Sequence, residues 1–216
     1  MTTPLRGIRR AGNTALLAEL ADLSDVLALR TALERHRPKG MRELVAAART
    51  LLVIYDPAVT GYDGLSRAVT ERAAALLETD GAPPPQALED DTLVVPVRYD
   101  GPDLADVAEL TGLTLDEVIA RHTAPLYTVA FAGFAPGFGY LVGTDPVLHL
   151  SRRSEPRTAV PAGSVAVAGG FTGVYPSSSP GGWQLLGTTG LPLWDQDRTP
   201  PALLVPGRSI RFKEAS

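Results

Sequence analysis

Apolar residues recur at helical spacing in two segments of the first half of the chain, 25–37 and 62–79. This spacing places them on one face of each segment, as expected for helices that pack against a core. The residues on these faces are Val26, Leu29 and Leu33 in the first segment and Leu65, Val69, Ala73 and Leu76 in the second. Asp22 or Ser24 is placed to cap the first helix.

Shorter apolar runs next to these segments predict strands at 43–48 and 50–55. The second run is strongly apolar, which is typical of a buried strand. A further apolar stretch at 15–20 follows the turn signal Gly12-Asn13 and predicts another strand. Strands and helices therefore mix in the first half, as they do in a small α+β domain.

The acidic, proline-rich segment DGAPPPQALEDD at 80–91 has no hydrophobic periodicity, so we place a domain boundary there. Beyond it, short apolar runs alternate with Gly and Pro turns, which predicts a β-barrel or a β-sandwich. The runs predicted as strands are 92–99, 127–131, 165–168, 183–187, 202–205 and 209–212. We expect an N-terminal α+β domain at 1–80, a linker at 81–91 and a C-terminal domain at 92–216.

Two short helices are predicted at 103–110 and 114–122, with Gly112 in the turn between them. A helix-turn-helix reading would imply DNA binding, but the second helix offers only Arg121 and His122 as basic groups. We therefore interpret the pair as a helical hairpin that covers the domain. Thr114 and Glu117 have the spacing of a capping box at the start of its second helix.

Composition narrows the function classes. The chain has 216 residues and a net charge of −4, which argues against a general nucleic-acid binder. It has no cysteine, so disulfides, thiolate metal sites and a cysteine nucleophile are excluded. Only two lysines are present and neither lies in a P-loop motif. We read no signal peptide and no membrane span, and expect a cytoplasmic, globular protein.

The segment SRRSEPRT at 151–158 carries three arginines, Arg152, Arg153 and Arg157. It is either a solvated basic loop or a clamp for carboxylate or phosphate, which the planar guanidinium fork suits. On the first reading, Glu155 would neutralise Arg157. His149 lies beside this segment, and none of the three histidines has metal-ligand spacing, so no metal site is predicted.

Glycine-rich segments at 169–176 and 179–184 suggest a lined cleft, because glycine lets the backbone approach a ligand closely. Their candidate binding residues are Gly169, Gly170, Thr172, Gly173, Tyr175, Gly181, Gly182, Trp183 and Gln184. Phe134, Phe138 and Tyr140 are expected to line that cleft or contact a partner. The G-x-G at 137–139 is not followed by an amphipathic helix and is no dinucleotide loop. Ser164 lacks a nucleophile-elbow motif.

Several ordered blocks together resemble a known family. The blocks are FAGFAPGFGYL (131–141), PRTAVPAGSVAVAGGFTGVYP (156–176), SPGGWQLLGTT (179–189) and LLVPGRSIRF (203–212). They are similar to the allophanate hydrolase subunit 1 family, which includes the B subunits of 5-oxoprolinases and Kip-type inhibitors of a sporulation histidine kinase. The family commonly has Gln at the position of Phe171, where this chain lacks the polar group.

The resemblance implies a small α+β domain followed by a cyclophilin-like β-barrel, related to the carboxyltransferase part of urea carboxylase. It implies the B subunit of an ATP-dependent 5-oxoprolinase that opens 5-oxoproline to L-glutamate. The implied partners are a homologous-fold C subunit, of the allophanate hydrolase subunit 2 type, and an A subunit. The implied cofactor is ATP with Mg²⁺, and we expect the chain alone to be inactive. The alternative is a non-catalytic module that inhibits a sensor histidine kinase.

For the enzyme, we expect Arg157, with Arg152 or Arg153, to bind phosphate, and Gln184 with Thr172 to recognise the amide. Arg157 and Gln184 are the expected catalytic residues. The other expected contacts with substrate or nucleotide are Phe138, Tyr140, His149, Ser164, Gly169, Gly170, Gly173, Tyr175, Gly181, Gly182 and Trp183. We also expect Trp183 to lie in or beside the cleft, near Phe138 and Arg157.

Overall fold

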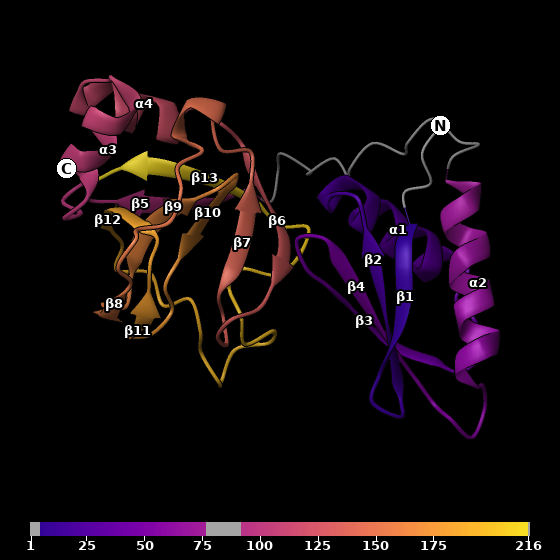
Figure 1. Cartoon of the computed structure of the whole chain (residues 1–216). Coiled ribbons are helices and arrows are strands. Elements are labelled where there is room, and N and C mark those ends of the chain that lie inside the picture. Colours follow the sequence, from indigo (N-terminus) through magenta and orange to yellow (C-terminus); the bar gives the residue numbers. More distant parts are fainter. Residues whose placement is uncertain (1–4, 77–91, 216) are drawn as a thin grey trace. The chain divides into compact units, whose positions relative to one another are not determined.

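The computed structural model describes residues 5–76 and 92–215, so the expected linker at 81–91 lies outside the described residues. The chain divides into two compact units, Met1–Gln86 and Ala87–Ser216, and each is described by itself (Figure 1). Within the described ranges, no helix is both long and apolar enough to cross a membrane.

The first unit is a four-stranded antiparallel sheet with two helices. Its elements are β1 (Leu5–Ala11), β2 (Ala15–Leu20), α1 (Leu23–Arg35), β3 (Met41–Ala46), β4 (Thr50–Tyr55) and α2 (Tyr62–Ala75). The strand order is β1-β2-β4-β3, and α1 and α2 pack against the strands. This confirms the α+β reading.

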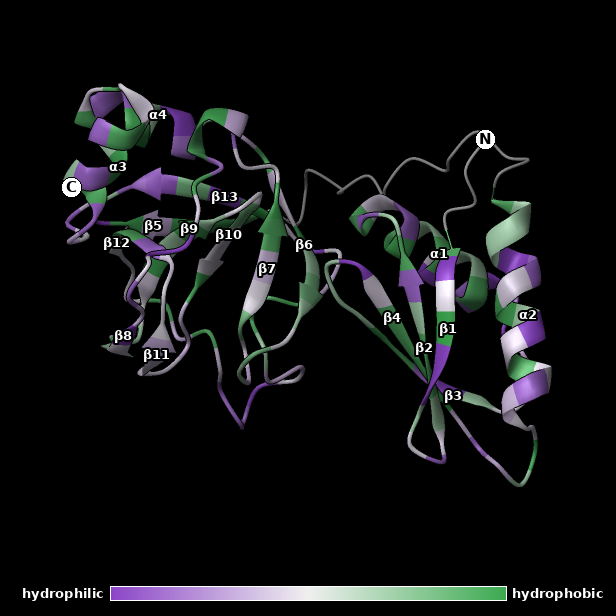
Figure 2. Cartoon of the chain, viewed as in Figure 1, coloured by the Kyte–Doolittle hydropathy of each residue, from purple (hydrophilic) through white to green (hydrophobic). Residues whose placement is uncertain are grey.

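The predicted residues Val26, Leu29 and Leu33 of α1 and Leu65, Val69 and Ala73 of α2 are buried, whereas Leu76 lies beyond the end of α2 and is half-buried. Each helix carries both apolar and polar residues along its length (Figure 2). Asp22 caps α1 by accepting a hydrogen bond from the Asp25 amide at 3.1 Å. Strand β1 was not predicted. Its sequence LRGIRRA has three arginines and only Leu5 and Ile8 as large apolar residues, which conceals the strand pattern.

The second unit contains most of the strands. Its elements are β5 (Leu93–Val97), α3 (Leu104–Thr111), α4 (Leu115–Thr123), β6 (Tyr127–Ala132), β7 (Gly139–Val142), η2 (Pro146–Leu148), β8 (Arg157–Val160), β9 (Ser164–Ala168), β10 (Phe171–Val174), β11 (Ser179–Gly181), β12 (Gln184–Thr188) and β13 (Ser209–Glu214). The large sheet has the order β12-β9-β10-β7-β6-β13-β5, and β8 pairs with β11. Among the described strands, only β13 and β5 pair in parallel.

The large sheet closes on itself. Just beyond β5, Arg98 exchanges two backbone hydrogen bonds of 2.8 Å with Thr188 at the end of β12. The Gly101 amide extends this seam to the Leu186 carbonyl at 3.1 Å. A Cβ on Gly101 would lie 2.2 Å from the Leu185 carbonyl oxygen, so only glycine fits there. The predicted barrel is therefore confirmed.

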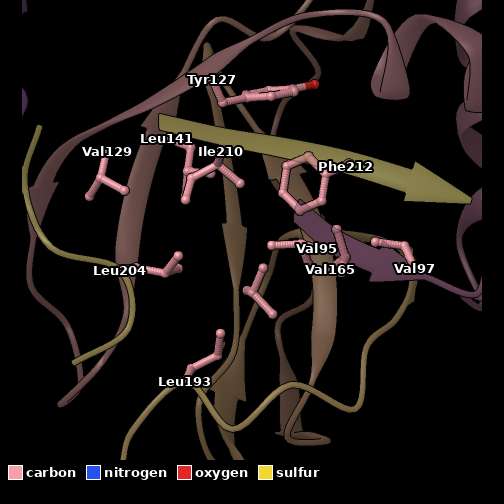
Figure 3. Packing of buried hydrophobic residues seen from close by; sticks show 11 residues of the cluster. Val95, Val97, Tyr127, Val129, Leu141, Val165, Leu193, Leu204, Ile210 and Phe212 are labelled. Atoms are coloured by element: carbon pink, nitrogen blue, oxygen red, sulfur yellow. The ribbon is translucent and has the colours of Figure 1, made fainter. Parts of the chain in front are cut away.

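Side chains from facing strands fill the barrel (Figure 3). This core comprises Val95, Val97, Tyr127, Val129, Leu141, Val165, Val174, Leu193, Leu204, Ile210 and Phe212. The hairpin α3–α4 contacts the barrel at β12 and β13. Its predicted capping box is confirmed, since the Thr114 amide donates to Glu117 Oε2 at 2.8 Å and the Glu117 amide to Thr114 Oγ1 at 3.2 Å.

Two sequence expectations for this unit are wrong. The run 202–205 is not a strand, because only Ala202 forms an isolated bridge, to Trp194. Pro200, Pro201 and Pro206 flank this run, and proline has no N–H to donate to a ladder. In addition, Arg157 does not belong to a loop. It is the first residue of β8 and lies opposite Gly181 of β11.

Candidate functional site

A buried carboxylate organises the arginine segment. Asp103, directly before α3, is 1% exposed, and its two oxygens accept four hydrogen bonds. Arg157 donates to both oxygens, at 2.9 and 2.7 Å, and Arg153 donates from Nη1 at 2.7 Å. The Leu185 backbone amide donates the fourth bond at 2.8 Å. One carboxylate thus joins three segments that are distant in sequence.

These partners keep Asp103 charged. Burial acts to raise the pKa of its carboxyl, but the Arg157 hydrogen bond, the Leu185 amide and the two arginine charges outweigh burial. The pKa of Asp103 therefore lies below its usual value. The hydrogen bond to Asp103 in turn raises the pKa of Arg157. Asp103 thus fixes both Arg153 and Arg157. Because it carries one negative charge against their two positive charges, these three side chains keep a net positive charge.

Arg157 is paired with Asp103 and makes no ion pair with Glu155, contrary to the sequence reading. The residues around Arg157 do not reveal Asp103 as its partner, because Asp103 lies 54 positions earlier in the sequence. The role of Arg157 as a ligand clamp stays a prediction. Its bidentate bond to a buried carboxylate favours a positioning role instead.

A cleft of about 940 Å³ lies along the arginine segment and α3. Its lining residues are Asp106, Glu109, Leu110, His149, Leu150, Ser151, Arg152, Arg153, Ser154 and Gln184. Four predicted site residues therefore meet here: His149, Arg152, Arg153 and Gln184. The Gln184 Nε2 donates to the Ser151 carbonyl at 3.2 Å, and the His149 Nε2 lies 3.1 Å from the Thr144 carbonyl.

Arg152 differs from the other two arginines of the segment. Its side chain is exposed, and it makes no hydrogen bond or ion pair with any residue in the part of the chain that the structure describes. Its charge acts to lower the pKa values of Tyr140 and Tyr175, although burial, the larger effect, raises both. Arg152 is thus the cation of this segment that remains available to an anionic ligand.

An aromatic cluster adjoins Gln184. Phe138 packs edge-to-face on Trp183 at 5.5 Å, on Tyr175 at 5.3 Å and on Tyr140 at 5.1 Å between ring centroids. Trp183 thus lies next to Phe138, which is one part of what was expected of it. Phe138 and Trp183 are buried, however, and neither ring lines the cleft. Phe171, where the family commonly has Gln, packs edge-to-face on Tyr140 at 5.7 Å.

Two glycines leave room for these aromatic rings. A Cβ on Gly173 would lie 2.8 Å from Phe138 and 3.0 Å from Trp183, and a Cβ on Gly181 would lie 2.4 Å from the Tyr175 hydroxyl. Aromatic rings therefore account for these two glycines without a ligand. Gly170 differs, because it faces the His149 ring, whose Cε1 would lie 3.5 Å from an added Cβ.

The remaining predicted residues lie outside the lining of the cleft. Ser164 donates its hydroxyl to the Pro161 carbonyl at 2.8 Å, and Thr172 is buried against the Thr144 hydroxyl at 3.0 Å. The predicted residues that do not line the cleft are Phe138, Tyr140, Arg157, Ser164, Gly169, Gly170, Thr172, Gly173, Tyr175, Gly181, Gly182 and Trp183. Within ranges 5–76 and 92–215, no group of three or more His, Cys, Asp or Glu residues could hold a metal ion.

One further ionisable group lies inside the second unit. His122 is fully buried, its Nδ1 lies 2.7 Å from the Tyr99 hydroxyl, and its ring packs on Phe212 at 4.6 Å. Its Nε2 has no hydrogen-bond partner among the described residues. Burial lowers the pKa of His122 to about 3, so the ring is neutral. Its position and pairing indicate a core residue.

Comparison with known proteins shows which proteins this chain is similar to. The chain is 50% identical over 132 residues to the B subunit of 5-oxoprolinase from Escherichia coli O157:H7, a match that covers 59% of this chain and 61% of that protein. The chain thus spans about three fifths of that relative's length. It is 38% identical over 190 residues to the B subunit of 5-oxoprolinase from Bacillus subtilis strain 168, which covers 82% of this chain and 77% of that protein.

Solved structures share the fold. The crystal structure of TTHA0988 matches with a TM-score of 0.72 and 39% identity, over 97% of this chain but 40% of the longer one. The Kluyveromyces lactis urea carboxylase matches in fold, with a TM-score of 0.72 at 18% identity, over 100% of this chain and 23% of that chain. The family model of the carboxyltransferase domain, subdomain C and D, matches residues 6–204. The chain therefore belongs to this carboxyltransferase-domain family.

Proposed function

We propose that the chain is the B subunit of an ATP-dependent 5-oxoprolinase, which opens 5-oxoproline to L-glutamate in the cytoplasm together with a homologous-fold C subunit and with an A subunit. The support is that curated relatives at 38–50% identity are named as the B subunit of 5-oxoprolinase. Such a name implies partner chains. The alternative, inhibition of a sensor histidine kinase, has no observation in its favour.

The proposed reaction requires activation of a stable amide. A five-membered lactam is an amide whose resonance resists hydrolysis, and ATP would activate its oxygen by phosphorylation before water attacks. The cleft does not suit the nucleotide. Arg152 is its one unpaired cation among the described residues, and Asp106 and Glu109 would repel a polyphosphate. In this proposal ATP and Mg²⁺ bind to the partner subunits, and this chain's part is to hold the substrate.

Substrate recognition follows from the groups in the cleft. Arg152 offers a planar donor fork for the carboxylate of 5-oxoproline. The Gln184 amide nitrogen is held by the Ser151 carbonyl, which orients its carbonyl oxygen as an acceptor for the lactam N–H. Asp103 fixes Arg153 and Arg157, so the segment that carries Arg152 is rigid before substrate arrives. The observation that carries this assignment is the single unpaired guanidinium in the cleft.

The experiment is reconstitution. The chain is co-expressed with the A and C subunits, and glutamate formation from 5-oxoproline and ATP is measured with and without each subunit. We expect turnover only in the complete complex, and Arg152→Gln should raise the KM for 5-oxoproline at least tenfold. Arg211→Gln, an exposed residue of β13, is the matched control and should change KM less than twofold. A complete complex without turnover would overturn the proposed function.

A further inference from the structure

Two exposed aromatic residues lie on adjacent loops of the barrel unit. Phe134 is 62% exposed and Trp194 is 41% exposed. Their loops, 133–137 and 191–201, touch, because a Cβ on Gly137 would lie 3.1 Å from the Trp194 Cβ. We call Phe134 and Trp194 with these two loops the docking surface. None of its residues lines the cleft described above.

The Phe134 loop is held in a strained conformation. Phe134 has a φ of 71°, in the left-handed region that a bulky side chain rarely occupies. Its ring rests edge-on against buried Phe138, at 5.4 Å between centroids, and lies 6.2 Å from Tyr175. A relaxed backbone would carry the ring elsewhere. The strained backbone therefore directs the Phe134 ring toward solvent while one edge stays packed against Phe138.

The Trp194 loop is fixed from inside by one guanidinium. Arg198 donates hydrogen bonds to the carbonyls of Pro192, Leu193, Pro200 and Pro201 at 2.7 to 3.4 Å. Arg198 is thus turned inward, whereas Asp195 and Asp197 are exposed and make no ion pair with any described residue. The rim beside Trp194 is consequently acidic.

We propose that this docking surface binds the homologous-fold C subunit, through an apolar socket on that subunit bordered by lysine or arginine. The proposal rests on the proposed function. Rigid, exposed aromatic residues are the usual anchors of protein interfaces, and preorganised loops lower the entropy cost of association. The acidic rim defines the charge of the partner. The match covers 40% of the longer TTHA0988 chain, so that relative carries more than half of its length beyond the matched part. A separate chain that supplies such a part must be held by a noncovalent interface.

The test measures binding of the purified full-length chain to the purified C subunit. Phe134→Ala combined with Trp194→Ala should raise Kd at least 30-fold. Leu115→Ala, which truncates a 47% exposed residue of α4, is the matched control and should leave Kd within twofold. Asp195→Lys combined with Asp197→Lys should slow association at least fivefold at low salt, with a smaller effect at high salt.

Phe134→Gly separates docking from folding. Glycine accepts a φ of 71° without strain, which offsets the lost ring contact with Phe138, so this variant should keep the melting temperature within a few degrees of wild type while it weakens binding at least tenfold. A double alanine variant that binds within threefold of wild type would overturn the docking surface and leave the proposed function intact. If wild type fails to bind the C subunit, both proposals fail. Loss of self-association alone would assign the surface to a second copy and overturn the proposal.

Discussion

Asp103 and His122 are both buried in the second unit, yet they are held in opposite charge states. Asp103 has four hydrogen-bond donors, two of them from the cation Arg157 and one from the cation Arg153, and remains an anion. His122 has one neutral partner, Tyr99, lies among aromatic rings and remains uncharged. Burial is nearly equal for the two side chains. The two groups differ in their surroundings, because two partly exposed arginines stabilise the charge of Asp103, whereas no charged group among the described residues contacts the deeply buried ring of His122.

The largest expected effect comes from removing the charge of Asp103. Asp103→Asn keeps the shape but leaves Arg153 and Arg157 without their anion, and we expect a loss of about 3 kcal/mol in free energy of unfolding, the lower end for breaking a buried pair. The partial exposure of both arginines, 32% and 25%, moderates the cost. Denaturant unfolding of the full chain measures it.

The control for this substitution is Asp106→Asn, since Asp106 is 61% exposed and 3.9 Å from Arg153. We expect a change below about 0.5 kcal/mol, as for a surface ion pair. Equal losses in the two variants would show that Asp103 is no better paired than a surface carboxylate.

A second prediction uses pH to separate the two groups. The folded pKa of His122 is about 3 against about 6.5 when unfolded, so the unfolded chain binds the extra proton as pH falls below 6.5. Stability should therefore drop by about 2 kcal/mol between pH 6.5 and pH 5. His122→Phe should flatten this part of the profile. A wild-type profile already flat there would contradict a neutral His122.

Asp103 acts in a lower pH window. Its folded pKa lies below the ordinary value of 3.8, so its contribution is present above that value and is lost as pH falls further. Asp103→Asn should thus remove pH dependence only below about pH 4. This places the two contributions in separate parts of one titration.

A smaller effect is expected from exchanging the arginines that bind Asp103, and Arg157→Lys is the larger of these two changes. Lysine retains the charge but not the two-pronged contact with Asp103, and we expect a loss of about 1 to 1.5 kcal/mol. Arg153→Lys replaces a single 2.7 Å bond and should cost less. Parallel unfolding curves of the two variants rank them. A larger effect for Arg153 would reverse the assignment of Arg157 as the main partner.

Local features were predictable from sequence and distant pairings were not. The capping box of Thr114 and Glu117 spans three residues and was found. The bond from Arg157 to Asp103 spans 54 positions and depends on barrel closure, which no sequence pattern shows. Gly173 and Gly181 looked like ligand-approach positions, because a sequence does not reveal that aromatic rings pack on them. The apolar runs predicted a barrel or a sandwich, and the family resemblance chose the barrel. Strand β1 was not predicted, because its three arginines obscure the alternation of apolar and polar residues.

The backbone bridge between Arg98 and Thr188, which closes the large sheet, limits how another chain can associate with this one. A closed ring of strands has no row of unpaired main-chain groups for another polypeptide to extend. The large sheet therefore offers no edge strand to another chain, although β8 and β11 form a separate two-stranded ladder. The four-stranded sheet of the first unit is different, since β1 and β3 are its open edges. Arg9 and Arg10 on β1 are exposed there, and such charges protect an edge strand from being recruited into intermolecular β-structure when the protein is concentrated.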